Sequence, residues 1–288
     1  MKTWFITGAS RGFGALVVER ALKKGDRVVA TARNPQAVTD RFGENPNLLA
    51  VALDVTDEAQ AIAAARAAVD RFDGIDILLN NAGFGLMGAV EETSAAEVET
   101  VFRTNVFGLL AVTRAVLPYM RERRSGHIIN ISSITGYSAV TGFGVYSATK
   151  FAVEGLSEAL HSELAPLGIH VTSVEPGFFR TDFLDASSLL VSPARIADYD
   201  ETAGKMRAVA AEVSHKQPGN PAKLADILID IVDAANPPVR LPLGSDTVAA
   251  IEEKHRTDRA ILDAWRSVSI STDFPQAEKS PVATGANN

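Results

Sequence analysis

A tyrosine, a lysine and a serine in the middle of this chain have the types and spacing for proton transfer coupled to hydride transfer. Tyr146 and Lys150 stand four residues apart, so on a helix they lie on one face and the ammonium can stabilise a phenolate. Ser133 precedes the tyrosine by thirteen positions, and a glycine-rich turn at residues 7–14 opens the chain. The Tyr–Lys spacing alone is a weak signal, and only its combination with the turn predicts this chemistry.

The glycine-rich turn has the features of a dinucleotide-binding loop. A short apolar strand ends at Thr7, and the next helix is expected to begin near Gly12. This geometry points free backbone N–H groups and the positive end of the helix at a pyrophosphate. Glycine at these points lets the backbone approach the phosphates. The alternative is an ordinary tight turn, but its position after the first strand favours the dinucleotide site.

The end of the second predicted strand indicates which dinucleotide binds. An acidic residue there would bond the ribose 2′-hydroxyl of NAD, but this strand ends in Ala32 and Arg33. Arg33 and Arg11 can both reach a 2′-phosphate, with Ser10 as a hydroxyl donor. Unless both arginines are simply solvated, they predict NADP(H).

Two further strand ends carry residues that suit a nucleotide. The carboxylate of Asp54 can accept a hydrogen bond from an adenine amino group, or it can cap a helix, although Thr56 and Asp57 are better placed to cap. Residues 80–85 are rich in Asn, Ala and Gly, which permits close contact with the cofactor ribose. The alternative for this segment is a plain turn.

Strand-like and helix-like patterns alternate along the chain. Short apolar runs of the kind found in buried parallel strands alternate with helical patterns that have apolar residues three and four apart. This alternation predicts an α/β fold, a doubly wound, mostly parallel sheet of seven strands with helices on both faces. After the first strand, we expect strands at 28–31, 48–53, 75–79, 127–131, 169–174 and 239–243, and helices at 13–24, 58–72, 98–123, 146–164 and 221–234.

Composition excludes several other classes of protein. The 288 residues contain no cysteine, which removes disulfides, thiolate nucleophiles and cysteine-ligated zinc. The five histidines show no ligand spacing, so we expect no catalytic metal site. The formal charge of -7 gives no overall attraction for nucleic acid or an anionic membrane. The N-terminus does not read as a signal peptide and no long apolar run follows, so we expect no membrane span and a cytoplasmic protein.

Two regions interrupt the alternation. Residues 181–218, polar and rich in turn formers, follow the sixth strand and are expected to fold over the site as a mobile lid; the alternative is a solvated surface excursion. Residues 274–288 are expected to form a loosely ordered tail. We therefore predict one catalytic domain at 1–273.

The combined motifs resemble the short-chain dehydrogenase/reductase family in its single-domain form. The T-G-x-x-x-G-x-G turn falls at 7–14, N-N-A-G at 80–83, Y-x-x-x-K at 146–150 and P-G at 176–177. The resemblance implies catalytic roles for Asn105, Ser133, Tyr146 and Lys150, with Asn105 anchoring a proton-relay water. With the motifs above, it predicts cofactor contacts at Gly8, Ser10, Arg11, Gly12, Phe13, Gly14, Arg33, Asp54, Val55, Asn81, Ala82, Gly83, Tyr146, Lys150, Pro176, Gly177, Phe179 and Thr181.

The resemblance implies an NADP(H)-dependent oxidoreductase that interconverts a carbonyl and its alcohol, with Tyr146 as general acid and base. Ser133, Tyr146 and Phe183 are expected to contact a hydrophobic ketone or aldehyde. A 3-ketoacyl-carrier reductase, which would need a basic patch such as the arginines at 121–124, is the first alternative. The second is a non-catalytic, NADPH-responsive binding protein. A homodimer or homotetramer is expected, as in relatives.

Overall fold

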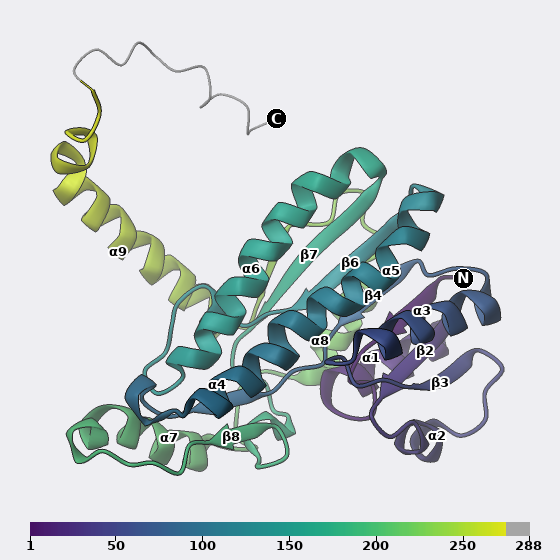
Figure 1. Cartoon of the computed structure of the whole chain (residues 1–288), viewed down its shortest axis with the longest axis horizontal. Helices are drawn as coiled ribbons and strands as arrows, with labels where there is room; N and C mark the ends of the chain where they lie inside the picture. Colours follow the sequence, from purple (N-terminus) through teal and green to yellow (C-terminus); the bar gives the residue numbers. More distant parts are fainter. Residues whose placement is uncertain (275–288) are drawn as a thin grey trace.

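The computed structural model of this protein describes residues 1–274 and has a seven-stranded sheet at its centre (Figure 1). All neighbouring strands in this sheet are parallel, in the order β3-β2-β1-β4-β6-β7-β9. The predicted doubly wound sheet is therefore confirmed. Its strands are β1 (Thr3–Ile6), β2 (Arg27–Ala32), β3 (Leu48–Ala52), β4 (Ile77–Asn80), β6 (Gly126–Ile131), β7 (Ile169–Pro176) and β9 (Arg240–Leu243).

Helices cover both faces of the sheet, because successive residues of a strand point to opposite sides. On β1, Trp4 and Ile6 pack with the first set of helices on one face of the sheet. Phe5 packs with the second set of helices on the other face. All three side chains are fully buried, which explains why this strand is apolar throughout. The first set is α1 (Gly12–Lys24), α2 (Gln36–Phe42) and α8 (Pro221–Ile231), and the second is α3 (Glu58–Phe72), α5 (Leu109–Arg123) and α6 (Gly144–Leu164).

The helix predicted at 98–123 differs in detail from the prediction. It begins earlier, as α4 (Ala95–Phe102), and is interrupted by a π-helical turn, η2 (Arg103–Gly108), before it continues as α5. The whole stretch Ala95–Arg123 is long and apolar enough to cross a membrane, but half of its apolar window is buried inside the fold. Within it, α5 packs on α3 and β4 as a core helix does. The seven-residue α2 was not predicted, because it is too short to show a clear period.

A second, two-stranded sheet joins the predicted lid to the rest of the fold. In it β5 (Gly85–Met87) pairs in parallel with β8 (Leu189–Val191). Strands of three residues leave too little pattern to predict from sequence. The remainder of the lid contains the short turn η5 (Asp182–Leu184) and α7 (Lys205–Val213).

The last helix, α9 (Ser245–Ile270), extends away from the sheet (Figure 1). Every residue from His255 to Ile270 is exposed, so only the start of this helix packs on the fold. The predicted loose tail at 274–288 lies outside the described residues except for Phe274, which is exposed.

Candidate active site

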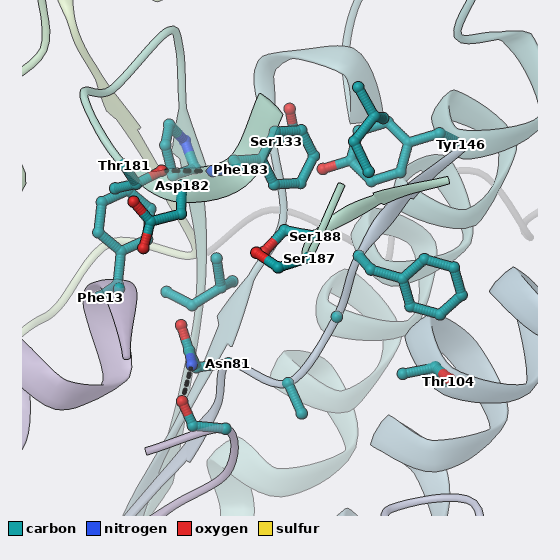
Figure 2. Close-up of a pocket in the computed structure, with 18 of the residues that line it drawn as sticks. Phe13, Asn81, Thr104, Ser133, Tyr146, Thr181, Asp182, Phe183, Ser187 and Ser188 are labelled. Carbon is teal, nitrogen blue, oxygen red and sulfur yellow. Dashed lines mark hydrogen bonds between the residues drawn. The ribbon is translucent and has the colours of Figure 1, made fainter. Parts of the chain in front are cut away.

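A large pocket lies at the carboxyl ends of the strands, where a doubly wound sheet binds its ligand. Its cavity has a volume of about 750 Å³. Figure 2 shows the pocket between the glycine-rich turn, the start of α6 and the lid. Of the predicted site residues, all but Gly14 and Asn105 line this cavity.

The glycine-rich turn is held by Asn81. The Nδ2 atom of Asn81 donates hydrogen bonds to the Thr7 and Gly8 carbonyl oxygens, at 2.9 and 3.1 Å. Gly8 has a φ of 65°, a conformation that favours glycine. A Cβ atom on Gly14 would clash with the Gly8 carbonyl and the Asn81 amide. Gly14 therefore lies behind the turn, where the absent side chain lets α1 pack closely, and its predicted contact with the cofactor stays a prediction.

The start of α1 fits a pyrophosphate. Arg11 stands at the N-cap without a side-chain capping hydrogen bond, and the first turn contains no acidic residue. The N–H groups at this end, together with the positive end of the helix, therefore favour an anion from the cavity. Gly8, Ser10 and Gly12 line the cavity here without bulky side chains. These residues fit the dinucleotide that the sequence predicts.

Two arginines and one carboxylate line the far end of the cavity. Arg33 and Arg11 are both exposed, and Arg33 lies near enough to Asp54 for its charge to lower the pKa of that carboxyl. The larger cause of the lowered pKa is the pair of hydrogen bonds from the Thr56 backbone and hydroxyl. Asp54 does not cap a helix, because Asp57 caps α3 by accepting from the backbone N–H of Gln60.

Arg11 makes a contact that the sequence did not predict. Its guanidinium donates a hydrogen bond of 2.5 Å to the backbone carbonyl of Ser187 in the lid. The side chain therefore bridges the glycine-rich turn and the lid across the mouth of the cavity, besides lying where a 2′-phosphate was expected.

The catalytic candidates meet at the opposite end of the cavity. Tyr146 and Lys150 lie in the first two turns of α6, and Ser133 follows β6. The Ser133 hydroxyl lies near enough to the Tyr146 phenol to act on its pKa, and it accepts a hydrogen bond from the Thr135 backbone N–H at 3.1 Å. Ser133 therefore both caps the turn η3 (Ile134–Gly136) and acts on the tyrosine. Lys150 Nζ lies 5.7 Å from the centre of the Tyr146 ring and donates to the Ile131 carbonyl at 2.8 Å.

Burial controls the ionisation of both groups. Tyr146 and Lys150 are 5% and 6% exposed. Burial raises the pKa of the Tyr146 phenol, and the nearby Ser133 hydroxyl opposes this shift. The spacing of Tyr146 and Lys150 predicts that the ammonium lowers the pKa of the phenol. In this structure, however, desolvation has the larger effect on that pKa. Burial also lowers the pKa of Lys150 to about 8, while the negative charge of Glu154 raises it.

Asn105 lies in η2 and is buried beside the catalytic helix. Its amide accepts from the Phe84 backbone N–H, donates to the Phe84 carbonyl at 2.9 Å, and donates to the Thr149 hydroxyl at 3.2 Å. The side chain therefore ties three segments together, and its expected role in holding a water stays a prediction.

The wall between the two ends of the cavity comes from the segment after β7. Pro176, Gly177, Phe179 and Thr181 all line it, as predicted. The backbone N–H of Phe178 donates to the Asp246 carboxylate at 2.7 Å, so the start of α9 fixes this turn. The Thr181 hydroxyl accepts from the Phe183 backbone N–H at 3.3 Å, which begins η5 (Figure 2).

The lid covers the tyrosine with aromatic and apolar side chains. The Phe183 ring lies 5.5 Å from the Tyr146 ring (Figure 2). On its outer side, α7 is attached through Arg207, which forms a buried ion pair of 2.6 Å with Glu92. This contact and the β5–β8 pair show that the lid is a folded substructure packed on the segment after β4.

Some lining residues were missed by the sequence reasoning. The Phe143 ring packs edge-on against the Tyr146 ring, with 6.2 Å between the ring centres. Phe143 is the N-cap of α6, three residues before Tyr146, and this spacing could have predicted the contact. Leu189, Gln217 and Thr104 carry no such signal, because they come from segments that only the folded chain brings together. Asp182, Asp185 and His215 of the lid bring three potential metal ligands within 4.8 Å of one another, although Asp185 is already paired with His215 at 3.1 Å.

Comparisons with known proteins agree with this fold and site. The family model described as short chain dehydrogenase matches residues 2–190. Oxidoreductase BOA17 of Botryotinia fuckeliana is 36% identical over 94% of this chain and 99% of its own length. A 3-ketodihydrosphingosine reductase of Bacteroides thetaiotaomicron is 38% identical over 83% of this chain and 86% of its own. The structure of a short-chain dehydrogenase from Streptomyces avermitilis has a TM-score of 0.88 at 41% identity, covering 95% of this chain and all of that one.

The chain belongs to the short-chain dehydrogenase family, whose members named here are oxidoreductases. Related structures include both nicotinamide dinucleotides. The NADP-bound structure of ElxO has a TM-score of 0.72 at 27% identity, covering 86% of this chain and 99% of that one. A Burkholderia phymatum enzyme in complex with NAD has a TM-score of 0.77 at 25% identity, covering 90% of this chain and 94% of that one.

Proposed function

We propose that this protein is an NADP(H)-dependent oxidoreductase that interconverts a hydrophobic ketone or aldehyde and its alcohol. The observation that carries the proposal is the contact of Ser133 with a buried Tyr146, one helical turn from Lys150, inside the large cavity. This arrangement provides one proton donor, one positive charge and one hydroxyl to orient a substrate oxygen.

Tyr146, Ser133 and Lys150 each have a separate role in the proposed reaction. A bound nicotinamide cofactor supplies or accepts the hydride. Tyr146 donates its phenolic proton to the carbonyl oxygen during reduction and takes it back during oxidation. Ser133 donates a hydrogen bond to the same oxygen, and Lys150 stabilises the phenolate that forms. Because burial raises the pKa of Tyr146, the phenol holds its proton at neutral pH and can serve as the acid in the reductive reaction.

The preference for NADP(H) rests on Arg33 and Arg11 and on the absence of an acidic residue at the end of β2. A hydrogen bond to a charged group contributes about 1.5 to 3 kcal/mol, which corresponds to roughly tenfold to a hundredfold in affinity. The NADP bound in the structure of ElxO supports this choice.

A hydrophobic substrate is supported by the side chains around Tyr146. Phe143, Phe183, Leu184 and Leu189 cluster there, together with Met87 and Val140. Apolar surface of this kind favours an uncharged, carbon-rich ligand. The relative named as a reductase of 3-ketodihydrosphingosine also supports a ketone. We expect the lid to open for such a substrate and close over it.

The carrier-linked alternative is less well supported. Arg123 pairs with Asp76 at 3.2 Å, and Arg124 donates to the Pro166 carbonyl. Arg123 ends α5 and Arg124 follows it, just before β6 begins. Both arginines therefore lie near the amino ends of the strands, whereas the cavity lies at their carboxyl ends. An acidic carrier bound there could not present its acyl chain to Tyr146. Self-association remains part of the proposal: Phe107 of η2 and Phe151 of α6 are 58% and 45% exposed, and sedimentation will give the oligomeric state.

The decisive experiment follows NADPH oxidation with a panel of ketones and aldehydes, including aliphatic and aromatic ketones and a 3-ketoacyl thioester. We expect turnover with hydrophobic ketones, and less with NADH at equal concentration. Turnover confined to carrier-linked thioesters would select the first alternative. NADPH binding without turnover of any carbonyl would select the non-catalytic alternative and reject the proposal.

A further inference from the structure

Two buried carboxyl groups lie behind the catalytic lysine, and the proposed reaction does not use either one. Glu154 on α6 is 3% exposed and Glu175 on β7 is 1% exposed. Ser173 donates a hydrogen bond of 2.6 Å to Oε1 of Glu154. Among the described residues, Glu154 Oε2 and Glu175 Oε1 each have no conventional hydrogen-bond partner. Burying two carboxylate oxygens without hydrogen-bond partners is costly, so their arrangement requires an explanation.

A shared proton provides that explanation. Glu154 accepts a hydrogen bond from Ser173, and Ser173 and Glu175 lie two residues apart on β7 with their side chains on the same face of the sheet, so the two carboxyl groups are neighbours. Two ionised carboxylates have only acceptors, so one of the two must be protonated for a hydrogen bond to form. Burial, with the nearby charge of Glu154, raises the pKa of Glu175 to about 7. Below that pH the pair carries one negative charge, and the shared proton forms a hydrogen bond between the two carboxyl groups.

The charged and titratable groups around the pair come from several elements. The Nε atom of Arg240 lies 3.6 Å from Glu154 Oε2, and its Nη2 lies 3.2 Å from the exposed Glu158 carboxylate. Its positive charge opposes the upward pKa shift of Glu175. The groups that face the pair directly or through Arg240 are Lys150 and Glu158 of α6, Arg240 of β9, Tyr137 beneath the Arg240 guanidinium, and His255 of α9 in contact with Tyr137.

Glu154 also connects the pair to the catalytic site. It follows Lys150 by one turn of α6, and its negative charge favours the protonated lysine. Burial lowers the pKa of Lys150 to about 8 even though the charge of Glu154 raises it, so loss of that charge would let the lysine lose its proton nearer to physiological pH. The pair of carboxyl groups thus supplies the negative charge that stabilises the buried Lys150 ammonium.

We propose that Glu154 and Glu175 share one proton, keep the Lys150 ammonium charged, and so set the alkaline limit of turnover. Both are positioning residues, because neither lines the cavity. When the shared proton leaves at higher pH, a second negative charge appears behind Lys150 and retains the lysine proton to a higher pH. The role in turnover rests on the proposed function, whereas the effect on Lys150 can be measured without turnover.

Three variants isolate the effect. Glu175→Gln keeps a neutral hydrogen-bond donor beside Glu154 and holds the pair at one charge at all pH values. The double variant Glu154→Gln with Glu175→Gln removes both charges. Glu158→Gln is the matched control, because Glu158 lies on the same helix and contacts the same arginine but is exposed.

The first measurement is the pH titration of Lys150 by carbon NMR of protein labelled at the lysine Cε, with the signal assigned by its loss in Lys150→Arg. We expect the Lys150 pKa to fall by about one unit in Glu175→Gln and further in the double variant. No change is expected in Glu158→Gln. An unchanged Lys150 pKa in Glu175→Gln would overturn the proposal, even if the double variant fails to fold.

The second measurement is the pH profile of kcat/KM with the best ketone. Its alkaline limb should move to lower pH by about the same amount as the Lys150 pKa in each variant. A limb that stays in place while the Lys150 pKa moves would overturn the role in turnover. A wild-type protein without turnover would reject the proposed function alone, because the NMR titration would still decide whether the pair charges Lys150.

Discussion

The two ends of the cavity differ in how they hold charge. At the catalytic end, Tyr146 and Lys150 are almost completely buried, and Ser133 and Glu154 act directly on their ionisation. At the other end, Arg11 and Arg33 are exposed to solvent. Electrostatic interactions are strong where water is excluded and weak where it is present. The chemistry therefore depends on the buried end. A substitution at the open end can change the choice of cofactor with a smaller effect on the rate of the reaction.

The largest effect should come from removing the proton donor at the buried end. Tyr146→Phe keeps the ring that packs against Phe183 and Phe143 but deletes the phenolic proton. We expect kcat to fall about a thousandfold or more, with the fold and NADPH affinity retained. Steady-state kinetics beside fluorescence titration with NADPH measures both. More than about a tenth of the wild-type rate would exclude Tyr146 as the proton donor.

A smaller loss is expected when the hydroxyl beside the tyrosine is removed. Ser133→Ala deletes the hydroxyl that acts on the pKa of Tyr146 and the hydrogen bond proposed to the substrate oxygen, so kcat should fall about a hundredfold. Ser138→Ala, in the turn that follows, serves as a control for nonspecific effects on this segment. Equal rates for wild type and Ser133→Ala would remove Ser133 from the mechanism.

At the open end, the expected effect is a change of preference rather than a loss of chemistry. Arg33→Asp replaces a cation that favours a 2′-phosphate with an anion that repels it. The ratio of kcat/KM for NADPH to that for NADH should fall by roughly tenfold to a hundredfold, while kcat with NADH changes little. An unchanged ratio would mean that Arg33 does not contact the cofactor. Higher ionic strength should reduce the wild-type preference, because the group is exposed.

The smallest effect concerns stability behind the buried end. The folded-state pKa of Glu175, about 7, lies above its ordinary value of 4.5, so the folded protein holds this proton more tightly than the unfolded chain does. The resulting stabilisation is fully present below about pH 4.5 and is lost as the pH rises through about 7. The free energy of unfolding should therefore decrease across this range by on the order of 2 kcal/mol from this group.

Urea unfolding at several pH values measures this slope in wild type and in Glu175→Gln. His127 contributes in the opposite direction, because burial lowers its pKa to about 3 and its stabilisation is lost as the pH falls. The difference between the two proteins cancels His127. Parallel pH profiles for wild type and Glu175→Gln would show that Glu175 does not hold the extra proton.

Prediction from sequence succeeded where the information is local. Alternating strand and helix patterns identified all seven strands of the sheet, and the glycine-rich turn located the cavity. Contacts that depend on packing could not be predicted: Gly14 packs behind the turn, the Asn105 amide binds Phe84 and Thr149, and Arg11 also contacts the lid. No periodic pattern encodes these contacts, because they join segments that are far apart in the chain.

The amino-acid sequence by itself determined the order of the elements and the residue types at the reacting positions, because both depend on short-range spacing. Only the tertiary structure decided how acidic those groups are. Tyr146, Lys150 and Glu175 owe their shifted pKa values to burial, and Glu154 meets Glu175 only because α6 packs on β7. Desolvation depends on every neighbour that excludes water, so the full set of packed elements is needed to set it.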